Sequence, residues 1–161
     1  ITQLYEGANG IQALDLVGRK LMMKGGRPAQ RLLGEINGFI AAHKDEAAMK
    51  EFVEPLEKAI GRVQDSALWL MQNGMKNPDE AGGAATDFLR LMALTAMAYM
   101  WARIAKAAQA GLAKGSDNDF YNAKLATGRF YVQRVLPQTT SLSHQIKAGA
   151  STLMALDAAA F

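Results

Sequence analysis

Cysteine is absent from this sequence, and the absence removes several kinds of chemistry. Without a thiol the chain forms no disulfide, no thiolate metal site and no cysteine nucleophile. The absence also fits a reducing compartment, so we expect the protein to be cytoplasmic. Aromatic residues are scarce at 7%, whereas alanine and methionine are plentiful. This mixture favours helix, because such side chains lose little rotamer freedom there.

Long uninterrupted hydrophobic runs are lacking as well. The most apolar stretch, from about Phe88 to Ile104, contains Arg90 and Arg103. A membrane-spanning helix needs about 20 largely apolar residues, so we predict a buried helix here and no membrane span. The 18 basic and 15 acidic residues give a net charge of +3 without a basic stripe. We therefore predict no nucleic-acid partner.

The chain begins at Ile1 rather than at methionine, and its first residues show no signal-peptide or transit-peptide pattern. We therefore expect a fragment or a processed chain. Its 161 residues suffice for one domain with a core of its own.

Five segments show apolar residues at helical spacings of three and four, with glycine, proline and asparagine between the segments. The predicted helices run from about Asn9 to Met23, Pro28 to His43, Asp45 to Asn73, Asn77 to Ala113 and Phe120 to Leu153. No stretch alternates as a strand would. Because long helices joined by short connections pack antiparallel, we predict an all-α fold. It is an up-and-down antiparallel bundle of about four long helices, with an N-terminal helix lying across it or against a partner domain.

Several residues predict where these helices begin or bend. Asp45 is a candidate cap for the third helix, and Asp117 or Asn118 for the last. Pro55 and Pro137 lie inside predicted helices, where proline removes a backbone hydrogen bond. We expect a kink at both prolines, or an earlier helix start at Pro55.

Two predictions concern which faces are buried. The first helix carries an amphipathic face that we expect to be buried, made of Ile11, Leu14, Val17, Leu21 and Met22. The fourth helix is apolar nearly all round beyond Thr86, so it should be the most buried.

The candidates for metal or ligand chemistry are few. His43 and His144 have no second histidine at helical spacing. Since a metal site needs several converging ligands, we predict no metal site and interpret both histidines as surface or helix-end residues. Trp69 and Trp101 lie on apolar faces and are interpreted as core. The nine methionines are interpreted in the same way, although methionine also lines promiscuous grooves.

Two pairs of cations could meet an anion. Arg19 with Lys20, and Arg129 with Arg134, lie close together in predicted helices. Dispersed cations on a helix more often form a solvated face, and we favour that interpretation.

Glu6 is the remaining candidate. It lies in the loop Leu4–Gly10, with glycines close after it and Tyr5 directly before it. A carboxylate in a tight apolar turn becomes a better base, because burial raises its pKa. The same acid before a helix also serves as a plain negative charge for the helix dipole. On spacing alone, this second interpretation is the commoner one.

The stretch Ile1–Gln12, with its Tyr5-Glu6-Gly7-Ala8 core and Ile11-Gln12 at a helix start, resembles a hallmark of the acyl-CoA dehydrogenase flavoenzymes. The usual pattern is an Ile or Leu, then Tyr-Glu-Gly-Thr, then Ile-Gln. The continuation Ala13–Leu21 is similar to the longer bacterial members, which carry an extra C-terminal helical region. The resemblance therefore implies that residues 1–25 end the catalytic C-terminal domain and that residues 26–161 form an appended helical bundle.

The resemblance implies a reaction and roles for these residues. Two hydrogens leave the Cα–Cβ bond of an acyl-CoA thioester, Glu6 takes the α-proton, and FAD accepts the hydride. Gly7 and Ala8 would lie at the cofactor, and Tyr5 with Gly7 would line the substrate site. An electron-transfer flavoprotein would be the redox partner, and a homo-oligomer is expected. Ala8 departs from the family pattern, because the usual threonine hydroxyl is missing.

The larger departure is that the other domains of the family are not part of this sequence. We therefore expect the isolated chain neither to bind FAD stably nor to turn over substrate. The alternative is a non-catalytic helical domain that associates subunits.

Overall fold

The computed structural model describes residues 7–115 and 117–160. Every regular element among these residues is a helix and none is a strand, so the predicted all-α class is confirmed. The α-helices are α2 (Ala8–Asp15), α3 (Arg27–His43), α4 (Lys50–Asn73), α5 (Pro78–Ala113), α6 (Asn118–Phe130) and α7 (Gln138–Ala148). Between or beyond them lie the π-helical turns η1 (Leu16–Lys20) and η3 (Tyr131–Val135) and the 3-10 turns η2 (Met23–Gly26) and η4 (Ala158–Ala160).

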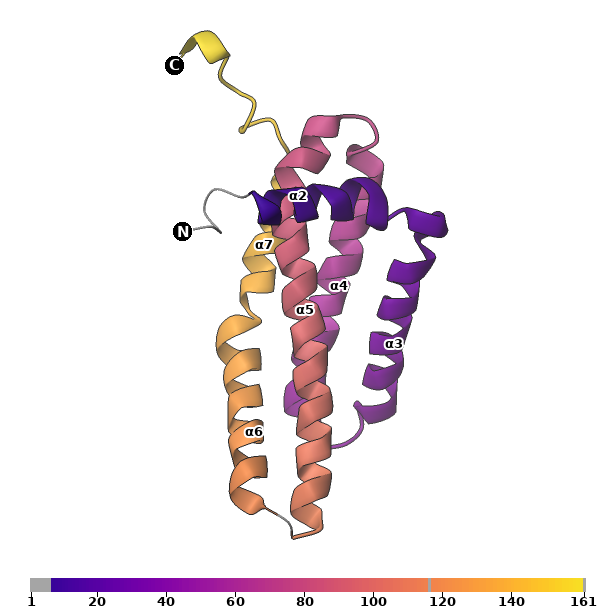
Figure 1. The fold of residues 1–161 in the computed structure, drawn as a ribbon, viewed down its shortest axis with the longest axis vertical. Helices are drawn as coiled ribbons and strands as arrows, with labels where there is room; N and C mark the ends of the chain where they lie inside the picture. Colours follow the sequence, from indigo (N-terminus) through magenta and orange to yellow (C-terminus); the bar gives the residue numbers. More distant parts are fainter. Residues whose placement is uncertain (1–6, 116, 161) are drawn as a thin grey trace.

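The long helices form an up-and-down bundle (Figure 1). α4 and α5 pack together at its centre, α3 packs on α4, and both α6 and α7 pack on α5. α2 lies across the long axis of the bundle and packs on α5. The predicted crossing position of the first helix is therefore confirmed.

α2 turns a different face inward from the one predicted. Ala13 is fully buried, whereas Ile11, Leu14 and Met22 are exposed, so the predicted burial is wrong for these three residues. The sequence periodicity predicted an apolar face, but the short helix packs on the bundle through the small side chain of Ala13. Part of its apolar surface therefore has no partner among the described residues.

The first helix ends where the glycines predicted. Lys24, Gly25 and Gly26 all have left-handed φ values, of 52°, 69° and 77°. Such residues reverse the chain after a helix. α3 begins directly afterwards at Arg27, with Pro28 in its first turn, where a missing N–H costs nothing.

α4 starts differently from the prediction. Its N-cap residue is Met49, which makes no side-chain cap hydrogen bond, so Asp45 as a cap is wrong. The fully buried Met49 side chain anchors this end of the helix instead. α4 continues through Pro55 without a break. The proline lies in the second turn and removes only the backbone hydrogen bond to Glu51.

Side-chain caps begin the other two long segments. The Asn77 side chain accepts a hydrogen bond from the backbone N–H of Asp79 at 3.0 Å, at the start of α5. The Asp117 carboxylate accepts one from the N–H of Phe120 at 3.1 Å, at the start of α6. The predicted starts near Asn77 and Asp117 are confirmed.

α5 is buried along one side. Phe88 and Leu91 are fully buried, whereas Met97, Met100 and Ile104 are exposed. The helix predicted to be the most buried is therefore buried on its inner face and exposed on its outer face.

The last predicted helix is two helices. The π turn η3 precedes Pro137, and the N–H of Leu136 bonds to the carbonyl of Tyr131 at 2.9 Å. At Pro137, where the sequence predicts a kink, the helix is interrupted between η3 and α7. α7 ends at Gly149, whose φ is 77°, so the predicted extension to Leu153 is wrong.

Two apolar clusters fill the bundle. One joins α3, α4, α5 and α6 around Ile36, Phe52, Leu56, Ala102 and Leu125. The other lies at the α2 end around Val63, Leu70, Phe88, Leu91 and Ile146, with Val17 and Leu21 packed on it. Trp69 and Trp101 are half-buried at the edges of the core. None of the helices in the described part of the chain is long and apolar enough to cross a membrane.

Candidate functional site

The sequence motif lies at the N-terminal edge of the described chain. Tyr5 and Glu6 fall outside the described residues, so their roles stay predictions. Gly7 is described, and its φ of 67° lies in the left-handed region that favours glycine. Apart from its chain neighbours and the backbone of its own helix, no described residue has an atom within 4 Å of the position that a Cβ on Gly7 would take. With respect to the described residues, the Gly7 backbone is therefore open to close approach by another group.

The N-terminus of α2 has backbone N–H groups that pair with no carbonyl of the helix. Gly7 provides no side-chain cap, and the first turn contains no acid. The first intrahelical bond runs from the N–H of Ile11 to the carbonyl of Gly7 at 3.0 Å. The three preceding N–H groups, of Ala8, Asn9 and Gly10, have no partner within the helix. A helix end of this kind attracts negative charge.

The cations that follow α2 are held by an acid of the same segment. Arg19 bonds to the two Asp15 oxygens at 2.6 and 3.0 Å, and the Lys20 ammonium lies 2.9 Å from the same carboxylate. Hydrogen bonds from Arg19, and then from Lys20, lower the pKa of Asp15 to about 2. The pair therefore forms a local ion-pair cluster at the surface, as the favoured interpretation predicted.

Arg129 is paired in the same way. Its Nε donates to the Glu51 carboxylate at 2.9 and 3.0 Å, joining α6 to α4. This hydrogen bond raises the pKa of Arg129 above its ordinary value. Arg134 is exposed on η3, whereas Arg129 is held by Glu51 of α4. The two arginines do not form a shared anion site.

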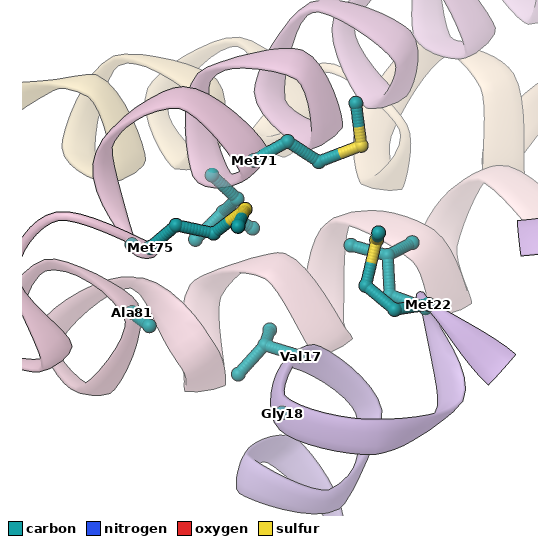
Figure 2. A pocket seen from close by; sticks show the side chains of 9 residues that line it. Val17, Gly18, Met22, Met71, Met75 and Ala81 are labelled. Carbon is teal, nitrogen blue, oxygen red and sulfur yellow. The ribbon is translucent and has the colours of Figure 1, made fainter. Parts of the chain in front are cut away.

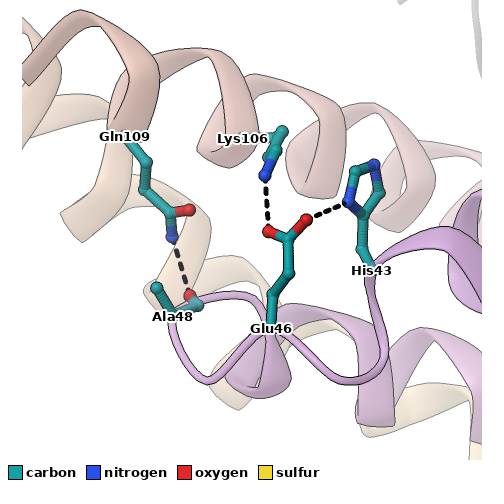
Figure 3. A network of polar contacts seen from close by, with 5 residues as sticks. All are labelled: His43, Glu46, Ala48, Lys106 and Gln109. Atoms are coloured by element: carbon teal, nitrogen blue, oxygen red, sulfur yellow. Dashed lines mark hydrogen bonds and ion pairs between the residues drawn. The ribbon is translucent and has the colours of Figure 1, made fainter. Parts of the chain in front are cut away.

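His43 belongs to a network that the sequence analysis missed. Its Nδ1 lies 2.8 Å from Glu46 Oε1, and the Lys106 ammonium lies 2.5 Å from Glu46 Oε2 (Figure 3). Glu46 stands three residues after His43, and that spacing alone could have pointed to the pair. Hydrogen bonds from Lys106, and then from His43, lower the pKa of Glu46.

This network is structural. His43 ends α3, as predicted, while Lys106 belongs to α5. Beside it, the Gln109 amide donates to the Ala48 carbonyl at 2.7 Å (Figure 3). Together these contacts fix the α3–α4 turn on α5. His144 is exposed on α7, also as predicted.

No metal centre is formed in the described ranges. No group of three or more histidine, aspartate or glutamate side chains converges there.

Most methionines line the surface, contrary to the prediction. Met49 is fully buried, but seven of the nine are exposed. Three of these, Met22, Met71 and Met75, line a groove of about 200 Å³ (Figure 2). Its opposite wall is Val17 and Gly18 of η1, and we call it the methionine groove. Long unbranched side chains at such a groove adapt to a partner's shape.

A second apolar hollow adjoins the methionine groove. It has a volume of about 390 Å³ and shares Leu21, Met22 and Met71 with the first. Gly25 and Gly26 form its edge, beside Leu68 of α4. The α2 end of the molecule therefore has an exposed apolar surface. Among the described residues, no charged side chain lines either hollow.

Two other ionisable groups have raised pKa values. Partial burial raises the pKa of Asp87 in α5 and that of Tyr131 in η3. The Tyr131 hydroxyl donates to the Leu94 carbonyl at 2.9 Å, which gives it a structural partner. Neither group lines the apolar surface at the α2 end.

Residues 32–157 match the family model described as "Acetyl-CoA dehydrogenase C-terminal like". The chain is 33% identical over 144 residues to a 3-methylmercaptopropionyl-CoA dehydrogenase of Ruegeria pomeroyi, with 88% of the chain and 24% of that relative covered. It is 29% identical over 170 residues to a broad-specificity linear acyl-CoA dehydrogenase of Mycobacterium tuberculosis, with 100% and 28% covered. A butyryl-CoA dehydrogenase of Syntrophomonas wolfei is 31% identical over 161 residues, with 92% and 25% covered. The chain thus spans about a quarter of the length of these relatives.

Proposed function

Because this chain belongs to the acyl-CoA dehydrogenase family and matches its C-terminal helical region, we propose that it is the C-terminal part of an FAD-dependent acyl-CoA dehydrogenase. The enzyme removes two hydrogens across the Cα–Cβ bond of an acyl-CoA thioester. The observation that carries the proposal is the similarity to a linear acyl-CoA dehydrogenase over 100% of this chain, the Tyr5-Glu6-Gly7 motif included.

Glu6 acts as the base that removes the α-proton of the thioester. Its own backbone N–H polarises the thioester carbonyl, which acidifies the α-position. Tyr5 and Gly7 line the substrate site. Bound FAD supplies the acceptor for the hydride from Cβ, and an electron-transfer flavoprotein then takes the electrons.

The described residues fit a group lying close to the motif. Gly7 has a left-handed φ and open space at its Cβ position, so a flat ring or a thioester meets no side chain there. The uncapped start of α2 offers N–H donors to an electron-rich or anionic group. On this proposal Gly7 and the half-buried Ala8 hold the cofactor side of the site.

Residues 1–25 then end the catalytic C-terminal domain, and residues 26–161 form the appended bundle. The family model supports this division, because its match begins at residue 32, within α3, which starts directly after η2. The isolated chain is inactive on this proposal, because it supplies a base and a scaffold but only a small part of a flavin site. The whole enzyme works in the cytoplasm.

A second candidate function is subunit association by the bundle. The exposed apolar side chains Met97, Met100 and Ile104 on α5 favour it, since they recur at helical spacing on the longest helix. Both functions hold together if the enzyme is a homo-oligomer.

The test is Glu6→Gln in the complete enzyme, with exchange of the α-proton of a bound acyl-CoA measured in deuterated water. A missing general base should slow exchange by about a hundredfold or more. Glu35→Gln, at an exposed position of α3, is the matched control and should exchange at the wild-type rate. Unchanged exchange in Glu6→Gln would show that Glu6 is not the base.

A further inference from the structure

The apolar surface at the α2 end is continuous from the helix to the methionine groove. Ile11, Leu14 and Gly18 are three and four residues apart, so they follow one another along one face of α2 and η1. Gly18 lines the methionine groove, and Met22 lies at the groove's end. We call Ile11, Leu14, Gly18 and Met22 the outer face of α2.

The outer face is exposed although it is apolar. Ile11 is 63% exposed, Leu14 55% and Met22 51%. The opposite side of α2 rests on the bundle through the fully buried Ala13. Acidic and basic groups of this segment, Asp15 and Arg19, pair with each other instead of covering the outer face. A short helix with apolar side chains on two sides is typical of a helix that packs between two bodies.

The position of α2 in the chain indicates which second body this is. The family model begins at residue 32, so α2 and η1 lie outside the matched helical region, although they pack on it. The relatives are about four times as long as this chain, as a coverage of 24% in one of them means. The sequence that precedes α2 is the proposed active-site motif.

We propose that the outer face of α2 and the methionine groove dock on the apolar surface of the polypeptide that precedes this chain in the complete enzyme. α2 is then packed on both sides, by the bundle and by the catalytic body, and this fixes the loop that carries Glu6. The inference rests on the proposed function for the identity of the second body, but its test does not use activity.

The native methionines supply a test that needs no substitution. Met22 and Met154 are both exposed in this structure, at 51% and 63%, but only Met22 belongs to the proposed surface. The complete folded enzyme is treated with dilute peroxide, and oxidation of each methionine is followed by mass spectrometry. Because oxidation follows exposure, docking should slow Met22 at least about threefold relative to Met154. A smaller difference would overturn the proposal.

Dilution shows whether Met22 is covered by the same polypeptide or by a second copy of the enzyme. Protection by the same polypeptide is independent of protein concentration, whereas protection by a second copy is lost when the oligomer dissociates. Concentration-independent protection of Met22 supports the proposal, and protection that disappears on dilution overturns it. Substitution gives a further readout: Leu14→Asp should lower the midpoint of thermal unfolding of the complete enzyme, while Met154→Asp should change it less. Equal effects of the two would contradict docking.

The result is independent of the catalytic test. If Glu6→Gln leaves proton exchange intact while Met22 is protected, the proposed base is wrong and the docking surface stands. If exchange is lost while Met22 is as reactive as Met154, the base stands and the docking surface is wrong.

Discussion

The ammonium of Lys106 lies 2.5 Å from Oε2 of Glu46, a contact that joins the α3–α4 turn to α5 across 60 residues of sequence. His43 contacts the other oxygen of the same carboxylate at 2.8 Å. One carboxylate thus links three parts of the bundle: the end of α3, the turn and the middle helix. Since neither partner is buried, the pair positions the turn more than it stabilises the whole fold.

Glu46→Gln should reduce stability near neutral pH but not in acid. Lys106, and then His43, hold the pKa of Glu46 below its ordinary value of 4.5. The carboxylate therefore contributes stability above that pH, and the contribution is lost as the pH falls through the lowered pKa of the folded state. Urea unfolding of both proteins between about pH 2 and pH 7 checks this. The effect should be small, because the pair is exposed to solvent.

The matched control is Glu57→Gln, at an exposed position of α4. Its stability should follow the wild type throughout the pH range. A constant difference between Glu46→Gln and wild type, from acid to neutral pH, would contradict an ionic role for Glu46.

Gly111→Ala should destabilise the bundle. A Cβ on Gly111 would lie 2.3 Å from two ring carbons of Tyr121, so α5 and α6 would have to separate or the ring would have to move. Overpacking of this kind costs about 1–3 kcal/mol. Chemical unfolding measures the loss, and it should shrink in a Tyr121→Leu background.

The control for this change is a glycine with room around it. Gly38 lies within α3, and no atom is within 4 Å of its Cβ position. Gly38→Ala should therefore raise stability by about 0.5–1 kcal/mol through helix propensity. A loss of similar size at both glycines would mean that the Tyr121 contact does not decide the effect.

Helix ends were predictable because their signals are local. Asn77 and Asp117 bond to N–H groups two and three residues away, and Pro137 breaks a helix by its own ring. Asp45 shows the limit of such signals. It has the chemistry of a cap, but the burial of Met49 sets the start of α4.

Which side chains are buried was less predictable, because burial depends on which element packs against each face of a helix. Ile11 and Leu14 carry the right periodicity for a core face, yet the bundle meets α2 on the side of Ala13. Lys106 gives no sign in the sequence of pairing with Glu46, since only the packing of α5 on the turn brings them together. The candidate base, Glu6, differs from both examples, because neither local spacing nor packing identifies it. Nothing in the spacing around Glu6 distinguishes it from a helix-start acid, and only family resemblance assigns it a role.

Asp117→Ala should weaken the start of α6. The carboxylate accepts the N–H of Phe120 at 3.1 Å, and loss of an N-cap costs about 0.5–2 kcal/mol. Asp117 also has a φ of 33°, which alanine tolerates poorly. Asp117→Asn should remain close to wild type, because asparagine caps helices and enters this region of φ. If the asparagine variant lost as much stability as alanine, the cap would not be the cause.

Gly149→Ala should destabilise the end of α7 more than an ordinary loop substitution. Gly149 has φ 77° and ψ −177°, a conformation that is nearly exclusive to glycine and costs other residues about 1–3 kcal/mol. A Cβ there would also lie 2.8 Å from Oε2 of Glu80. That same oxygen accepts the N–H of the buried Ala150 at 2.9 Å, which holds the chain after α7 against the start of α5.

Gly115→Ala separates the cost of backbone strain from the cost of the contact with Glu80. Gly115 has a φ of 70°, but no described residue other than its chain neighbours has an atom within 4 Å of its Cβ position. Both substitutions should lower the midpoint of urea unfolding, and Gly149→Ala should lower it further, because Glu80 must also move. Hydrogen exchange should then locate the extra loss at the Ala150 amide. Equal midpoints, with the Ala150 amide still protected from exchange, would mean that backbone strain causes the whole loss of stability. The contact with Glu80 would then contribute nothing to it.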